Sequence, residues 1–257
     1  MFVLVIGDII GQPGRKAVHE VLPQMRRQYP LDMVIANAEN AAGGFGLTPA
    51  IAQELIEAGV YVLTSGNHIW AQKDIIPDLD SEMPVLRPLN YPAGVPGRGY
   101  LITGQTMVVN LMGRTFMNDI DCPFRAMDRL LEETEDRPPV VIVDFHAEAT
   151  SEKMAMGRYL DGRVSAVLGT HTHVGTIDAQ ILPHGTAYVT DIGMTGPTNS
   201  IIGDDVDSVI RRFLTGIPHH LSVGKGKPVF NAMLVDVDEG SGRAVSIERI
   251  CQQLERP

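Results

Sequence analysis

Five runs of apolar, β-favouring residues are each followed by polar residues that can bind metal, and this pattern constrains the fold most strongly. The runs are FVLVI (2–6), MVIA (33–36), VYVLT (60–64), VVIV (140–143) and VSAVL (164–168). Continuous apolar runs of this length are typical of strands buried on both faces. Polar groups at the ends of such strands converge on one edge of a sheet, where α/β folds place their chemistry. The pattern therefore predicts an α/β fold with a site at that edge.

The residues that follow these runs share a donor chemistry. They are Asp8, Glu39, Asn40, Asn67, His68, His146, His171 and His173. All of them offer oxygen or imidazole nitrogen and none is a thiol, so the set suits borderline or hard divalent ions. His171 and His173 have period-two spacing, so an extended backbone would point both rings in the same direction. We interpret the set as the site of a two-metal hydrolase.

Glu39 is the natural bridge between two ions, because its carboxylate offers two oxygens. One ion is assigned to Asp8, Asn40 and His173, and the other to Asn67, His146 and His171. Two divalent ions keep a net positive charge beside two carboxylates and a bridging hydroxide, which favours phosphate chemistry with that hydroxide as nucleophile. His68 adjoins a proposed ligand and is assigned the role of general acid.

The order of these motifs resembles that of the calcineurin-like metallophosphoesterases: an Asp, an acidic residue with Asn, Gly-Asn-His, a lone His, and Gly-x-His-x-His. The stretches VIGDIIGQPGR, NAENAAGGFGLT, TSGNHIW, DFHAEATSEK, GTHTHV and DIGMTGP are similar to the bacterial YmdB-like phosphodiesterase branch. Relative to the general superfamily pattern, Ile10 replaces the first His, Glu39 replaces the bridging Asp, and Ile69 follows His68. These departures resemble the YmdB-like branch, in which Asn40 would take the coordination place of the missing His.

The resemblance implies a four-layer α/β/β/α sandwich of two mixed sheets flanked by helices. It implies two transition-metal ions, iron or manganese, as cofactors. It also implies hydrolysis of small phosphodiesters such as 2′,3′-cyclic nucleotides, with His68 as proton donor. Two alternatives stay open: a phosphomonoesterase or protein phosphatase, and a regulatory RNA-associated metal-binding module with little turnover.

The composition restricts the kinds of partner that the protein is expected to bind. The formal charge of −10 argues against a broad grip on nucleic acid, although a small phosphorylated ligand or a short RNA end is compatible with it. We expect one domain over residues 1–257, because no linker or repeat divides the chain. No run reaches the roughly 18 apolar residues of a membrane span, and MFVLVIGDII lacks the features of a signal peptide, so the expected location is cytoplasmic. Cys122 and Cys251 are expected to be free thiols, and homo-oligomer formation is left open.

Local patterns predict several other features. Prolines and glycines between Pro84 and Leu111 interrupt short strands, which indicates an antiparallel meander. Helices are expected at 13–29, 49–59, 123–133, 151–160 and 205–214, and further strands at 186–190, 229–236 and 244–250. The dinucleotide, P-loop and nucleophile-elbow motifs are absent from the sequence, which favours the metal interpretation.

Single residues of the set also allow structural interpretations. Asp8 alone could cap a turn, and His146 alone could be a hydrogen-bonded core histidine, but such explanations would have to coincide at five strand ends. The histidines assigned to no metal are His19, His184, His219 and His220. The candidate phosphate clamps are Arg87, Arg114 and Arg125, among which the sequence does not choose.

Overall fold

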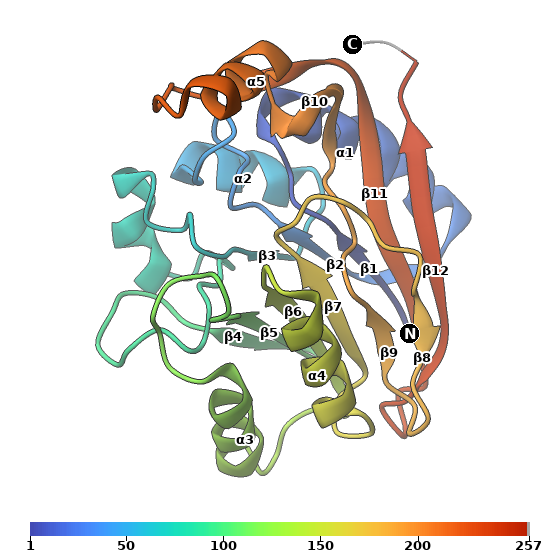
Figure 1. The fold of residues 1–257 in the computed structure, drawn as a ribbon. Helices are drawn as coiled ribbons and strands as arrows, with labels where there is room; N and C mark the ends of the chain where they lie inside the picture. Colours follow the sequence, from blue (N-terminus) through green and yellow to red (C-terminus); the bar gives the residue numbers. More distant parts are fainter. Residues whose placement is uncertain (256–257) are drawn as a thin grey trace.

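The computed structural model describes residues 1–255, in which two six-stranded sheets lie at the centre and helices cover them (Figure 1). The first sheet has the order β10-β11-β1-β2-β3, with β12 beside β11. Its parallel strands are β1 (Phe2–Ile6), β2 (Leu31–Asn37) and β3 (Val62–Thr64). Its antiparallel strands are β10 (Gly196–Asp204), β11 (Val223–Val237) and β12 (Ala244–Gln253). The first and the last strand of the described residues therefore belong to the same sheet.

The second sheet has the order β4-β5-β6-β7-β9-β8. Its parallel strands are β5 (Thr106–Met112), β6 (Val140–His146), β7 (Ala166–Thr170) and β9 (Ala187–Val189). The antiparallel edge strands are β4 (Tyr100–Thr103) and β8 (Gln180–Ile181). The predicted antiparallel pairing between Pro84 and Leu111 is confirmed by the hairpin of β4 and β5, but β5 also pairs in parallel with β6, which the prediction of a meander did not include. The physical reason is the intervening helix α3 (Pro123–Glu133), which carries the chain back to the end of the sheet at which β5 begins, so that β6 runs parallel to β5.

The helices cover the two outer faces, as Figure 1 shows. Helices α1 (Gly11–Gln28) and α2 (Pro49–Glu57) pack on the first sheet, whereas α3 and α4 (Thr150–Leu160) pack on the second. Residues alternate along β1, so Leu4 and Ile6 face the helices while Val3 and Val5 face the other sheet. One apolar core thus lies between the sheets and one lies under each helical layer. The predicted four-layer α/β/β/α sandwich is confirmed.

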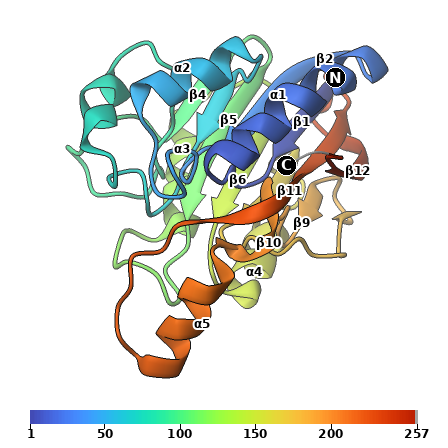
Figure 2. The ribbon, with the colours of Figure 1, turned by 90° about the horizontal axis from the view of Figure 1, so that it is seen from above.

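Two segments lie outside these four layers. A 3₁₀ helix, η1 (Lys73–Asp80), follows β3, and α5 (Val206–Thr215) lies at the periphery, as Figure 2 shows. The strand before α5, β10, was not predicted, because its sequence GPTNSIIGD contains glycines, a proline and few apolar residues. Within residues 1–255, no helix combines the length and apolar character needed to cross a membrane. Cys122 and Cys251 are free, as expected.

Candidate metal centre

All of the predicted site residues lie at the carboxyl ends of strands from both sheets. Asp8 follows β1, Glu39 and Asn40 follow β2, Asn67 and His68 follow β3, His146 ends β6, and His171 and His173 follow β7. The backbone N–H of His171 donates to Asp8 Oδ2 at 3.2 Å across 163 positions of sequence. Parallel strands place their carboxyl ends on one edge, and the packing of the two sheets brings these edges together. The structure therefore unites the complete predicted set.

His146 lies at the centre of one half of the cluster. Its Nε2 atom lies 3.1 Å from Glu39 Oε1, 3.1 Å from Asn67 Oδ1 and 3.0 Å from His171 Nδ1. The potential ligand atoms of Glu39, His146 and His171 all lie within 4.8 Å of one another. Glu39 and His146 are buried, so water does not screen these groups from one another. Such a set of acceptors requires a proton or a cation among them.

Asp8 lies at the centre of the other half. Its carboxylate is fully buried, and Oδ1 accepts no hydrogen bond from residues 1–255. This oxygen lies 3.7 Å from His173 Nε2 and 3.8 Å from His146 Nδ1. A buried charged oxygen without a partner is costly unless a cation neutralises it. The donor set and this orphaned oxygen both fit a bound metal ion.

Hydrogen bonds orient two of the three histidine rings. Thr170 Oγ1 donates to Asp144 Oδ1 at 2.7 Å, so it accepts from the Nδ1–H of His146 at 2.9 Å. The Nδ1–H of His173 donates to the carbonyl oxygen of Ile202 at 2.6 Å.

The third ring, that of His171, contacts the Glu148 carboxylate through Nε2 at 3.0 Å. The other nitrogen of each ring lies near a cluster residue: His146 Nε2 near Glu39, His173 Nε2 near Asp8, and His171 Nδ1 near His146. This arrangement is typical of metal-binding histidines, whose second nitrogen donates to a fixed acceptor.

The pKa shifts of Asp8 and His146 reflect the same demand for positive charge. Burial raises the pKa of Asp8, although the nearby imidazoles of His173 and His146 act to lower it. Burial disfavours the charged form of His146, but the carboxylates of Glu39 and Asp8 outweigh it and raise the His146 pKa to about 9. The pKa of His171 falls to about 3, because of burial and repulsion from His146. The carboxylates thus draw positive charge toward themselves, which a metal ion would supply.

His68 borders both the cluster and an open pocket. Its backbone N–H donates to Glu39 Oε2 at 3.0 Å, and its Nδ1 lies 2.7 Å from Asn40 Oδ1. Because an amide oxygen only accepts, the Nδ1 atom of His68 carries the proton. Burial lowers the pKa of His68, while the charge of Glu39 acts to raise it. The contact with Asn40 leaves Nε2 as the ring nitrogen available to a ligand.

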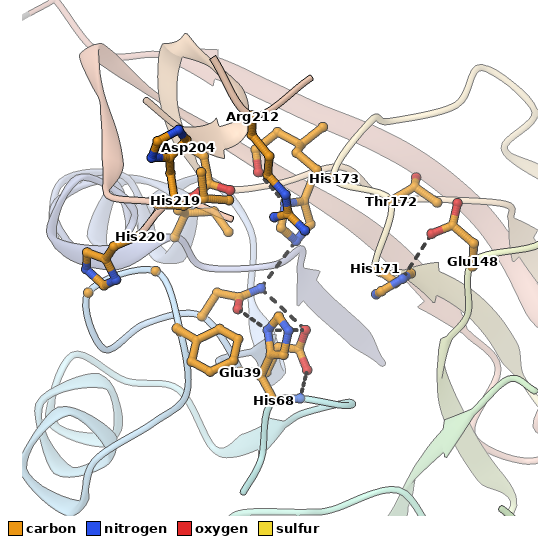
Figure 3. Close-up of a pocket in the computed structure, with 17 residues that line it drawn as sticks. Glu39, His68, Glu148, His171, Thr172, His173, Asp204, Arg212, His219 and His220 are labelled. Carbon is orange, nitrogen blue, oxygen red and sulfur yellow. Dashed lines mark hydrogen bonds and ion pairs between the residues drawn. The ribbon is translucent and has the colours of Figure 1, made fainter. Parts of the chain in front are cut away.

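A pocket of about 690 Å³ opens beside the cluster. In the view of Figure 3, Glu39 and His68 lie below, whereas Arg212 and Asp204 lie above. The volume of the pocket is within the range of about 300–1,000 Å³ that is usual for small-ligand sites. The cavity is therefore large enough for an organic ligand, and it is lined by five of the predicted residues, namely Glu39, Asn40, His68, His171 and His173.

None of the three arginines that the sequence offers as phosphate clamps lines the pocket. Arg212 of α5 lines it, whereas Arg87, Arg114 and Arg125 do not. Arg87 instead donates to backbone carbonyl oxygens of Pro96 and Pro88. Arg212 therefore replaces these three as the arginine best placed to meet a ligand in the pocket.

Sequence reasoning did not identify some of the pocket residues. These are Glu148, Thr172, Ile202, Asp204, Arg212, His219, His220 and Leu221. The sequence analysis assigns neither His219 nor His220 to a metal, and the structure puts both in the pocket wall. Glu148 had a local signal, since it comes two residues after His146. Arg212 had none, because a basic residue on an amphipathic helix is usually solvated.

Known proteins resemble this chain over almost its entire length. The family model described as YmdB-like protein matches residues 4–250. A Bacillus subtilis protein named 2′,3′-cyclic-nucleotide 2′-phosphodiesterase is 46% identical, over 97% of this chain and 96% of that protein.

Two solved structures share the fold. A hypothetical protein from Thermus thermophilus is 51% identical, with a TM-score of 0.92 and complete coverage of both chains. A structure described as a novel phosphatase from Mycoplasma pneumoniae is 34% identical, with a TM-score of 0.93 over 100% of this chain and 95% of that one. The similarity therefore covers the site and both sheets.

Proposed function

Because the chain belongs to the YmdB-like protein family, we propose that it is a phosphodiesterase that uses two metal ions, either iron or manganese. Its substrates would be small phosphodiesters such as 2′,3′-cyclic nucleotides. Support comes from the 46% identity to a protein named for this activity, and from the oxygen and imidazole donors at the strand ends. Such donors suit borderline or hard cations.

Glu39 would bridge the two ions, and the other proposed ligands divide between them. Asp8, Asn40 and His173 would hold one ion, and Asn67, His146 and His171 would hold the other. When bound, the metal pair supplies an activated water and positive charge at the phosphate. Thr170, Glu148 and the Ile202 carbonyl would keep the three imidazoles in their binding orientation.

His68 would deliver a proton to the leaving oxygen of the ester. Its Nδ1 proton is held by Asn40, so the transferred proton would come from Nε2 of the doubly protonated ring. In a 2′,3′-cyclic phosphate, the oxygen of the attacking water would form a new bond to phosphorus while one P–O bond to the ribose breaks, and the freed ribose oxygen would take the proton from His68. The anionic phosphate favours the charged imidazole when substrate is bound.

The observation that carries the proposal is the buried Asp8 Oδ1, which lacks a hydrogen-bond partner in the described chain and lies near two imidazoles. It argues for a cation at a place where the sequence already predicts ligands. The adjoining 690 Å³ pocket gives an organic phosphodiester access to that place.

The first test is the metal content of the purified protein, followed by hydrolysis assays before and after chelation. We expect two metal ions per chain, and activity that chelation removes and manganese or iron restores. Glu39→Gln and His171→Ala should lose metal and activity together, whereas His68→Ala should keep the metal and lose turnover. His184→Ala, at an exposed position, is the matched control and should retain both.

A panel of esters separates the alternatives. Faster hydrolysis of bis-p-nitrophenyl phosphate than of p-nitrophenyl phosphate supports a phosphodiesterase, and the reverse preference would indicate a phosphomonoesterase. Binding of a cyclic nucleotide without hydrolysis at saturating manganese would instead favour the regulatory module. Full turnover by His68→Ala would remove the proton-donor role.

A further inference from the structure

An exposed aromatic ring lies beside the proposed proton donor. Phe45 lines the pocket, and 53% of its surface is exposed to solvent. The centre of its ring lies 4.2 Å from that of His68, with the two planes inclined at 47°. One part of the ring thus supports His68 while another part faces the open pocket. An exposed apolar ring at this place suggests a contact with the ligand.

The loop that carries Phe45 holds it firmly. The backbone N–H of Phe45 donates to Ala42 O at 3.2 Å, and its carbonyl accepts from Gln72 Nε2 at 2.8 Å. Gly44 and Gly46 adopt φ angles of 90° and 85°, a conformation that other residues rarely adopt. The ring is therefore presented by a fixed backbone, and a ligand that stacks on it loses little further entropy in the protein.

The pocket is also larger and more apolar than a phosphate group requires. Its volume is about 690 Å³, and Ile10, Ile202 and Leu221 line it together with Phe45. Ile202 is 51% exposed, so an apolar wall faces the solvent there as well. A substrate that fills this space must carry a sizeable, partly apolar group next to its phosphate.

We propose that Phe45 is a specificity-determining residue on which the nucleobase of the substrate stacks. The inference rests on the proposed phosphodiesterase function and narrows its substrate class to phosphodiesters that carry an aromatic base. Every base has a π face, so stacking of this kind accepts both purines and pyrimidines. Phe45 itself takes no part in bond breaking; it positions the phosphate of a stacked nucleotide over the cluster.

The test compares a substrate that has a base with one that lacks it. Adenosine 2′,3′-cyclic phosphate and glycerol 1,2-cyclic phosphate share the strained five-membered phosphodiester ring, and only the first carries a base. Phe45→Leu removes the π face, whereas Phe45→Trp preserves it. Any disturbance of His68 by Phe45→Leu acts on both substrates, so the ratio of the two kcat/KM values isolates the stacking contribution.

We expect Phe45→Leu to lower the kcat/KM ratio of adenosine over glycerol substrate about tenfold, chiefly through KM, as stacking of one base predicts. Phe45→Trp should keep the kcat/KM ratio of the wild-type protein. Phe116→Leu removes a ring that is 89% exposed outside the pocket, and it should leave the ratio unchanged. An equal fall for both substrates would overturn the proposal and leave Phe45 only as a support for His68.

Binding gives a readout that does not depend on turnover. Titration calorimetry of the manganese-loaded protein with adenosine 3′-phosphate should show about tenfold weaker binding for Phe45→Leu. If wild-type protein hydrolyses neither cyclic phosphate, the proposed function fails, but this loss of affinity would still support base stacking. Unchanged affinity and an unchanged substrate ratio would exclude it.

Discussion

The ammonium group of Lys153 lies 2.6 Å from the carboxylate of Asp191, and both side chains are buried beneath the proposed metal centre. Asp191 Oδ2 also accepts the backbone N–H of Thr172 at 3.1 Å and its hydroxyl at 2.8 Å. Thr172 separates His171 from His173, whose φ angles are 99° and 65°. Residues other than glycine rarely adopt positive φ, so neighbouring contacts must hold this segment in place. The ion pair thus anchors the two histidines through the residue between them.

Replacement of Lys153 by Met should destabilise the protein and loosen its hold on metal. The change leaves the Asp191 carboxylate buried without its cation, and breaking such a pair costs about 3–5 kcal/mol. Urea unfolding of the chelated protein measures the stability, and elemental analysis measures the metal. Lys225→Met, at an exposed position, is the control and should alter neither. Wild-type stability and metal content in Lys153→Met would show that the pair does not anchor the segment.

Replacement of Glu148 by Gln should weaken metal binding while leaving the fold intact. Glu148 contacts His171 Nε2 at 3.0 Å and so favours a free electron pair on Nδ1, which faces His146. Loss of such an outer carboxylate typically weakens metal affinity by about 10–100-fold. Competition with a chelator of known affinity measures the change. The exposed Glu132→Gln is the matched control, and equal affinities in the two variants would contradict this role.

Replacement of Arg212 by Gln should raise KM for phosphodiesters by about tenfold, the effect of losing one charge-assisted hydrogen bond of roughly 1.5 kcal/mol. Arg212 belongs to α5 and lines the pocket, where Figure 3 labels it. Inhibition by inorganic phosphate should weaken as well. Arg125→Gln, at an exposed position outside the pocket, serves as the control. Identical kinetics for the two variants would argue against a contact between Arg212 and the phosphate.

Replacement of Gly66 by Ala should disrupt the cluster through overlap of atoms. A Cβ atom at Gly66 would lie 2.1 Å from His146 Cδ2, far inside van der Waals contact. Overpacking of this kind costs about 1–3 kcal/mol, and relief by rotation of His146 would remove its Nε2 from the ligand set. The thermal unfolding temperature and the metal content should both fall. A Cβ atom at Gly240 would meet nothing closer than 3.5 Å, so Gly240→Ala is the control and should behave as wild type. Wild-type unfolding and metal content in Gly66→Ala would refute the packing argument.

The helical layers, most strands and the full cluster could be predicted from the sequence, because these features have local signals. Thr48 and Pro49 mark the start of α2, and the structure shows Thr48 Oγ1 accepting from Ile51 N at 3.4 Å. Apolar runs mark buried strands by residue type alone. Strand β5 had no such signal for its direction, because parallel pairing with β6 depends on the return of the chain through α3.

The residues around the site differ in the same way, since some have a signal in the sequence and others have none. Asp8 and His173 follow strands of different sheets, and their residue types together with their positions after apolar runs predicted a shared site. Arg212 lies on a helix whose sequence resembles any amphipathic surface helix, so nothing local separates it from Arg125. Lys153 is another example, since a lysine on a helix is usually solvated and here is buried.

The amino-acid sequence by itself determined which donors stand at the strand ends, because strand periodicity and ligand chemistry are properties of short segments. Only the tertiary structure decided which partners orient those donors and which side chains surround the cavity. Glu148 reaches His171, and Asp191 reaches Thr172, through packing between segments remote in sequence. Such contacts arise from how two sheets and their connecting loops meet, and no local pattern encodes that arrangement.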